Sequence, residues 1–135
     1  AALSRRDYGE TIAHLVAPTR YPYQFARNYQ KWAEKPADAP WDAHSIIALI
    51  APRAVLLQTG NTDKWSDPYG EFLAAKAATP VFTLLGQKGI EEFSLPAPGK
   101  PLMNRLGYLM HDGGHSVLPA DWPVFFDFLQ AHLKP

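Results

Sequence analysis

The chain has 135 residues, of which 47% are hydrophobic and 19% charged, and its formal net charge is zero. This composition is typical of a folded globular protein, and the length is enough for one domain with a core. The neutral charge argues against a nucleic-acid-binding protein or a polybasic membrane surface, because both need clustered Lys and Arg. The absence of cysteine excludes a disulfide scaffold, a cysteine-ligated zinc site and a cysteine nucleophile.

Targeting signals are not visible in the sequence. No apolar run approaches the roughly 18–20 residues that a membrane span needs. The initial residues AALSRR are not followed by the apolar region of a signal peptide. Because the chain does not begin with Met, we expect it to be a processed product or an excerpt of a longer protein.

The first half of the chain is predicted to be mainly helical. Phe25, Tyr29 and Trp32 recur at helical spacing, which predicts a helix over residues 21–34 that ends before Pro36. A loop is expected at 36–40. Asp42 is then predicted to cap a short helix that Pro52 stops. Its apolar face is expected to comprise Ile46, Leu49 and Ile50.

The second half alternates strands and helices. The apolar run 54–58, which ends at Thr59-Gly60, predicts a buried parallel strand. A polar loop over 61–66 follows, and Asp67-Pro68 is a strong helix start. The buried stripe of that helix is expected to comprise Tyr69, Phe72 and Leu73, and Pro80 is expected to break it.

Residues 87–104 show no period and are predicted to be a surface insertion. A second buried strand is predicted over 106–110, then a loop over 111–118, and a last helix over about 121–133. One wide apolar face of that helix comprises Trp122, Phe125, Phe126, Leu129 and Leu133. The alternating order predicts an α/β fold with a parallel sheet and helices on its faces. Because two strands do not make a viable sheet of this kind, the remaining strands are expected to lie in a segment outside this chain.

Two loops follow the carboxyl ends of the predicted strands, where open parallel sheets place their sites. The first contains Asp63 and the second contains His115, which follows Gly113-Gly114. In α/β-hydrolases the catalytic residues occur in the chain order Ser, acid, His. An acid after one strand and a histidine after the next match the last two of these. We therefore interpret residues 1–135 as the C-terminal part of a single α/β-hydrolase domain, with no second domain.

Other interpretations of these residues stay open. Asp63 could be a turn residue that caps its own loop, and His115 could be a loop histidine bonded to backbone. His111 and His115 are four apart, but the intervening glycines disfavour the helix that a metal pair would need, so neither a metal nor a cofactor is expected. The remaining histidines are expected to be structural (His14 and His44) or on the solvent side of the last helix (His132).

A serine nucleophile is not recognisable. None of the serines lies in the Gly-x-Ser-x-Gly context of a strand-to-helix elbow, and Ser66, although near Asp63, is not on such an elbow. The five are Ser4, Ser45, Ser66, Ser94 and Ser116. The chain on its own is therefore expected to show no esterase turnover.

Four segments together resemble bacterial glucuronoyl esterases, which form carbohydrate esterase family 15. They are AALSRRDYGE from Ala1 to Glu10, WDAHSIIALIAPR from Trp41 to Arg53, GNTDKWSDPYGEF from Gly60 to Phe72, and GYLMHDGGH from Gly107 to His115. The resemblance implies a serine-type, metal-independent hydrolase of (4-O-methyl)-glucuronoyl esters between glucuronoxylan and lignin alcohols, and an extracellular or periplasmic location.

The resemblance also implies roles for particular residues. His115 matches the catalytic base, and Asp63 matches one position of the acid, although some members carry the acid after an earlier strand. Glu10 matches a glutamate that bonds sugar hydroxyls, and Trp65 matches a tryptophan beside the glucuronate. The nucleophile, and the arginine beside it that helps to bind the oxyanion, would lie upstream, so the N-terminal part of the same hydrolase domain is an expected partner.

Two other functions remain possible on the sequence. One is another esterase or a peptidase of the same fold, such as an acetyl esterase, which would not need Glu10 and Trp65. The other is a non-catalytic carbohydrate-binding module that uses the aromatic segment to stack sugars. Its aromatic residues are Tyr21, Tyr23, Phe25, Tyr29 and Trp32. Packing in a protein core explains the same aromatic pattern.

Overall fold

The structure is a computed structural model that describes residues 2–6 and 8–133. Two residues of the AALSRRDYGE segment, Ala1 and Asp7, lie outside the described part. The helices are α1 Ile12–Leu15, α2 Arg27–Gln30, α3 Ala43–Ala48, α4 Pro68–Leu84 and α5 Asp121–His132, and the strands are β1 Val55–Gly60 and β2 Leu106–His111. Short 3₁₀ helices occur at Ser4–Arg6, Pro22–Gln24 and Pro36–Asp38. No helix in this part of the chain has the length and apolarity to cross a membrane.

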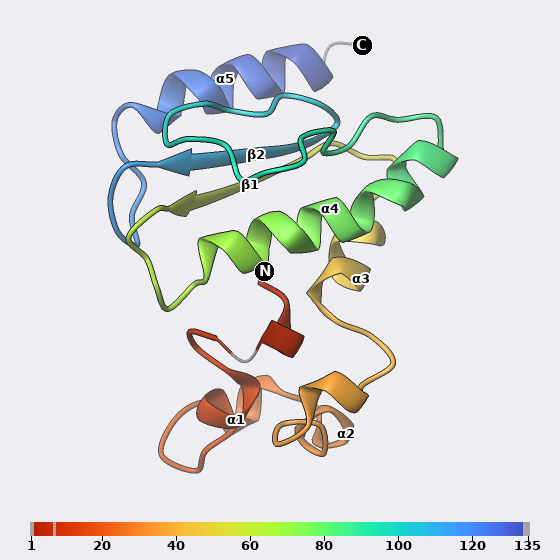
Figure 1. Ribbon diagram of the computed structural model, residues 1–135, viewed down its shortest axis with the longest axis vertical. Helices are drawn as coiled ribbons and strands as arrows, with labels where there is room; N and C mark the ends of the chain where they lie inside the picture. Colours follow the sequence, from red (N-terminus) through yellow and green to blue (C-terminus); the bar gives the residue numbers. More distant parts are fainter. Residues whose placement is uncertain (1, 7, 134–135) are drawn as a thin grey trace.

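Both predicted strands are confirmed, and they pair in parallel. The register runs from Val55 opposite Leu106 to Gly60 opposite His111, so the two carboxyl ends meet at one edge. Figure 1 shows α4 on one face of this two-stranded sheet and α5 on the other. The outer edge of β2 is partly covered, because Leu102 forms an antiparallel bridge with Tyr108. In the described chain β1 pairs only with β2, so its other edge has no strand beside it.

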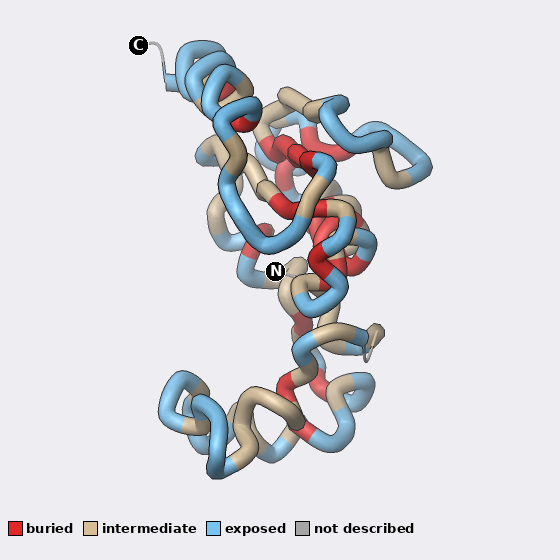
Figure 2. The backbone as a smooth tube through the Cα atoms, turned by 90° about the vertical axis from the view of Figure 1, so that its left-hand side faces the viewer, coloured by how far each residue is buried: buried red, intermediate tan, exposed pale blue. Residues whose placement is uncertain are grey.

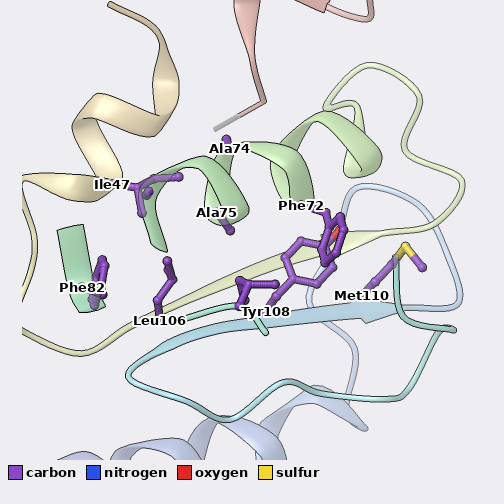
Figure 3. Close-up of a cluster of buried hydrophobic side chains, with 10 residues drawn as sticks. Ile47, Phe72, Ala74, Ala75, Phe82, Leu106, Tyr108 and Met110 are labelled. Carbon is purple, nitrogen blue, oxygen red and sulfur yellow. The ribbon is translucent and has the colours of Figure 1, made fainter. Parts of the chain in front are cut away.

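The core lies between α4 and the sheet. Alternate residues of β2 point to this face, and the buried side of α4 covers them (Figure 3). The core side chains labelled there are Ile47, Phe72, Ala74, Ala75, Phe82, Leu106, Tyr108 and Met110. Phe72 and Tyr108 meet edge-to-face at 5.7 Å, and the Tyr108 hydroxyl donates to the Pro68 carbonyl at 2.7 Å. The predicted burial of Phe72 is confirmed. The predicted burial of Tyr69 is wrong, because this residue is 44% exposed.

The prediction that Pro80 breaks the helix is wrong. α4 continues through Pro80 to Leu84 because Phe82, fully buried, holds the last turn in the core. Pro80 itself is exposed, so its ring faces solvent rather than the core. Gly86 follows the end of the helix, and its φ of +74° allows Gly86 and Gln87 to donate to carbonyls of the last turn.

The single helix predicted over 21–34 is wrong. Extended backbone at Phe25 and Ala26 separates a 3₁₀ turn from the four-residue α2. The Gln30 side chain donates to the Pro22 and Phe25 carbonyls, which satisfies the interrupted backbone. Tyr29 and Trp32 both pack against the Trp41 ring at 5.7 Å. These contacts with a distant residue override the local helical spacing.

Asp42 and Asp67 each cap a helix and also anchor the N-terminal segment. Asp42 is confirmed as the N-cap of α3, and its buried carboxylate also accepts from the backbone N–H groups of Ser4 and Arg5 at 2.7 and 3.0 Å. Asp67 is confirmed as the N-cap of α4, and Arg6 bonds to it at 2.6 Å. The predicted face of α3 is wrong: Ile47 is its buried residue, and Ile46 and Leu49 are exposed.

Three further expectations for the second half need correction. Residues 87–104 contain no helix or strand, but Ile90 is buried in the core, so the segment is not wholly a surface insertion. The predicted apolar face of α5 is largely exposed, because Phe128 packs against the sheet at Gly107 instead. His132 is half-buried and donates to the Met103 carbonyl at 2.9 Å, so it does not face solvent.

Buried residues concentrate around the sheet and α4, while residues of the N-terminal segment are mostly of intermediate burial or exposed (Figure 2).

Candidate active site

Two loops meet at the carboxyl ends of β1 and β2; they are the acid loop, residues 61–66, and the histidine loop, residues 112–118. Backbone bonds join them, from Asn61 to the His111 carbonyl at 3.0 Å and from Thr62 to the Gly113 carbonyl at 2.9 Å. Gly60 is required for this approach, because a Cβ there would lie 2.3 Å from the Gly114 carbonyl oxygen. The parallel register therefore brings together two segments about fifty residues apart in sequence.

Asp63 and His115 are in direct contact across this junction. The Asp63 Oδ2 atom lies 2.7 Å from His115 Nδ1. The Asp63 side chain is 7% exposed and that of His115 is 87% exposed. The carboxylate is thus fixed in the protein while the imidazole projects toward solvent, where a substrate and a nucleophile could reach it.

The environment of Asp63 keeps it ionised. Burial alone would raise its pKa. The pKa is nevertheless lowered below its ordinary value by hydrogen bonds from the Ser66 side chain, from His115 and from the Ser66 backbone, and by the charge of His115. An ionised carboxylate only accepts hydrogen bonds, so Nδ1 of His115 carries the proton that is shared with Asp63. Nε2 then has a free lone pair, which is the state that a general base needs.

Ser66 lies beside Asp63 and next to Nδ1 of His115, the ring nitrogen that faces Asp63. Its N–H donates to Asp63 Oδ1 at 3.3 Å, and its Oγ lies 3.3 Å from His115 Nδ1. A nucleophilic serine would have to face Nε2 instead, because Nδ1 is already bonded to Asp63. No other serine in the described residues hydrogen-bonds to His115.

The N-terminal segment carries Glu10 to the acid loop. The Glu10 N–H donates to the Trp65 carbonyl at 2.8 Å. Gly9 has φ +73°, and a Cβ there would lie 2.4 Å from the same carbonyl oxygen, so glycine is needed at this contact. The Glu10 carboxylate bonds to Arg20 at 3.3 Å. The Trp65 ring is 59% exposed and contacts the His14 ring at 5.3 Å.

All four residues singled out from the sequence line one cavity of about 620 Å³; they are Glu10, Asp63, Trp65 and His115. Residues of the N-terminal segment also line it, among them the apolar Ile12, Leu15 and Phe25. The cavity therefore combines a proton-handling pair, a carboxylate and an exposed indole. Among residues 2–6 and 8–133 no three His, Asp or Glu side chains are grouped so as to hold a metal ion.

Sequence reasoning missed several residues of the site. Ser66 was considered only as a nucleophile, and its contact with Asp63 was not foreseen. Gln58 ends the apolar run of the first predicted strand, and a polar side chain at that place could have pointed to the site. It bonds to His111 and to the Ser116 carbonyl. Nothing in the spacing of Glu10 and Arg20 pointed to their ion pair.

Comparison with known proteins shows the family to which this chain is similar. The family described as "Glucuronyl esterase, fungi" matches residues 4–86, more than half of the chain. Carbohydrate esterase MZ0003, from an unknown prokaryotic organism, is 40% identical over 133 residues, which are 98% of this chain and 30% of that protein. The glucuronoyl esterase structure from Teredinibacter turnerae, assigned to carbohydrate esterase family 15, is 38% identical with a TM-score of 0.89, over 98% of this chain and 32% of that one. The structure of the Solibacter usitatus glucuronoyl esterase is 40% identical with a TM-score of 0.90, over 99% and 34%.

The parallel strands, the helices on both faces and the Asp–His pair at the strand ends define the C-terminal portion of an α/β-hydrolase fold. The chain spans about a third of the length of the relatives that it matches. It belongs to the glucuronoyl esterase family.

Proposed function

We propose that the protein is a serine-type carboxylic ester hydrolase acting on (4-O-methyl)-glucuronoyl esters that link glucuronoxylan to lignin alcohols. His115 is the general base and Asp63 the acid that orients it. The contact of 2.7 Å between Asp63 Oδ2 and His115 Nδ1, on a cavity that Glu10 and Trp65 also line, carries this proposal. Relatives named as glucuronoyl esterases support the substrate class.

In this mechanism the serine hydroxyl attacks the ester carbonyl while Nε2 of His115 takes its proton. The tetrahedral intermediate then collapses, the alcohol leaves with that proton, and a glucuronoyl–serine ester remains. Water, deprotonated by the same nitrogen, hydrolyses it and regenerates the serine. Asp63 holds the Nδ1–H tautomer and stabilises the imidazolium that forms in each half-reaction.

The serine is proposed to come from the N-terminal part of the same single hydrolase domain. Two features support this partner. The outer edge of β1 has no strand beside it in the described chain, so its backbone groups are available for a further strand. The α5 face that carries Trp122, Phe126 and Leu129 is about half exposed, which is unusual for large apolar side chains in a finished domain.

Substrate recognition is proposed to depend on Glu10 and Trp65. A carboxylate accepts hydrogen bonds from sugar hydroxyls, and an exposed indole packs against the apolar face of a pyranose ring. A polymeric cell-wall substrate is too large to enter a cell, so we also propose that the protein acts outside the cytoplasm.

The test is alcohol release from benzyl glucuronate ester by the complete hydrolase that carries residues 1–135. Turnover should be abolished in His115→Ala and retained in His132→Ala, because the His132 ring bonds to the Met103 carbonyl and packs on Phe128, away from the cavity. The 135-residue chain alone should release no alcohol. Turnover that persists in His115→Ala would refute the role of this histidine. Hydrolysis of acetyl esters but not of glucuronate esters would refute the substrate class.

The non-catalytic module receives less support from the structure. Tyr29 and Trp32 pack on Trp41, and Phe25 stacks on Tyr29 at 5.5 Å, so contacts among the rings explain this aromatic pattern. In the aromatic segment Tyr21 and Tyr23 are exposed, whereas the other three rings are partly buried. A sugar-stacking platform needs free ring faces, and Phe25, Tyr29 and Trp32 are already packed against other rings.

A further inference from the structure

A second histidine–aspartate pair lies beneath the active-site loops. His111, the last residue of β2, has Nδ1 at 2.9 Å from Oδ2 of Asp121, the first residue of α5. Both side chains are almost completely buried, with 5% and 3% exposure. Gln58 of β1 adjoins them, with its Nε2 at 2.8 Å from His111 Nδ1. These three side chains, the Gln58–His111–Asp121 cluster, lie on the α5 side of the sheet, opposite the core formed with α4.

The bonds of this cluster go to the backbone of the histidine loop. His111 Nε2 donates to the Gly114 carbonyl at 3.0 Å, and Gln58 donates to the Ser116 carbonyl at 3.1 Å. Asp121 accepts from the Leu118 N–H at 2.8 Å. Residues 114 and 116 are the two neighbours of His115, so the cluster holds the backbone on both sides of it.

His115 has little else to fix its position. Its side chain is 87% exposed, and the hydrogen-bond contacts of its ring are to Asp63 and Ser66 of the other loop. Two glycines precede it, and glycine leaves a backbone unusually free before it is ordered. The desolvation of the two buried side chains, His111 and Asp121, is costly unless their hydrogen bonds are made. Three bonds of the cluster are made to the loop, and three join its side chains to one another.

We propose that the Gln58–His111–Asp121 cluster is a positioning unit that sets the location of His115 against Asp63 and against the reacting serine. His111 is thus a positioning residue and not a second base. This inference rests on the function proposed above. It predicts that weakening the cluster lowers kcat and leaves KM nearly unchanged, because the cluster acts on the proton-transferring ring and not on the sugar-binding residues.

The test compares His111→Gln with His132→Gln in the complete hydrolase. His132 serves as the control because it also donates to a backbone carbonyl, at 2.9 Å, but has no hydrogen bond to the histidine loop. A displacement of His115 by about 1 Å would lower kcat about 100-fold. His111→Gln should show a loss of that order, and His132→Gln should keep the wild-type kcat.

A second readout does not depend on turnover. The ¹⁵N chemical shifts of the His115 ring report its tautomer, which should be Nδ1–H in the wild type and in His132→Gln. In His111→Gln we expect a mixture of tautomers, because the His115 ring no longer keeps its hydrogen bond to Asp63. If the wild-type enzyme hydrolyses no glucuronate ester, the proposed function fails, yet the ring shifts still decide whether the cluster positions His115.

Two results would overturn the proposal. One is a His111→Gln variant with kcat and His115 ring shifts equal to those of the control. The other comes from Gln58→Met, which is used if His111→Gln does not fold. This variant keeps the size of the side chain and removes the bond to the Ser116 carbonyl, so it should lower kcat and alter the His115 ring shifts. A folded Gln58→Met variant with unchanged kcat and unchanged ring shifts would refute the positioning role.

Discussion

Replacement of Asp63 by Asn tests the assignment of the acid most directly. The change keeps the shape of the side chain, so the effect comes from the hydrogen bonds. The Ser66 N–H donates to Oδ1, so the oxygen of Asn should occupy that position and its NH₂ group should face His115 Nδ1. An NH₂ group donates to Nδ1, which forces the ring proton onto Nε2. The histidine would then be unable to accept the proton of the serine.

The size of this effect follows from the tautomer. The same replacement at a serine-protease triad costs about 10⁴-fold in kcat, which corresponds to about 5 kcal/mol of transition-state stabilisation. We expect a loss of this order in the complete hydrolase, measured as kcat on benzyl glucuronate ester. The matched control is Asp112→Asn, because Asp112 lies in the histidine loop and bonds to Asn61 but not to His115. Equal and small losses in the two variants would refute Asp63 as the acid and assign that role to a carboxylate from an earlier strand.

Three further predictions follow from the site and the core. Because the pKa of Asp63 is lowered from 3.8, its stabilising contribution is complete above that value and is lost as the pH falls through the lower folded-state pKa. The free energy of unfolding from urea titrations should therefore fall more steeply below pH 3.8 in the wild type than in Asp63→Asn, and equal slopes would contradict the pKa shift. Glu10→Ala should weaken kcat/KM for glucuronate esters but not for acetyl esters, and equal losses on both would argue against a uronate site. Phe72→Ala should destabilise the fold by about 3–5 kcal/mol in the same titrations, since it empties the core between α4 and β2; a loss below about 1 kcal/mol would contradict its central place.

The sequence predicted the strands and the helix starts well for a local reason. Val55–Gly60 and Leu106–His111 are short apolar runs between turn residues, and such runs suit only a buried strand or a short buried helix. Asp42 and Asp67 cap helices with their own side chains, so a few neighbouring residues are enough to recognise them. The juxtaposition of Asp63 with His115 followed from the parallel order of the two strands.

What the sequence did not predict depends on contacts between distant segments. Phe25, Tyr29 and Trp32 do recur at helical spacing, but Tyr29 and Trp32 pack against the distant Trp41, and the helix is interrupted. The apolar face of α5 was recognised, yet periodicity cannot say that Phe128 faces the sheet while Trp122 does not. The role of His111 was not predicted, because its partner Asp121 lies ten residues further on and carries no motif. The sequence offered only the spacing of four between His111 and His115, and the intervening glycines disfavour a metal pair there.

The anchoring of the N-terminal segment has a consequence for changing the specificity of the enzyme. Arg6 is bonded to Asp67 just beyond the acid loop, and Glu10 is bonded to Trp65 within it. Under the proposed function, the segment that recognises the sugar is thus bonded to the loop that aligns the proton acceptor, and a substitution that shifts the first is expected to disturb the second. Diversity is better introduced at the exposed residues Pro18 and Thr19, with Arg20 kept because its guanidinium pairs with the Glu10 carboxylate.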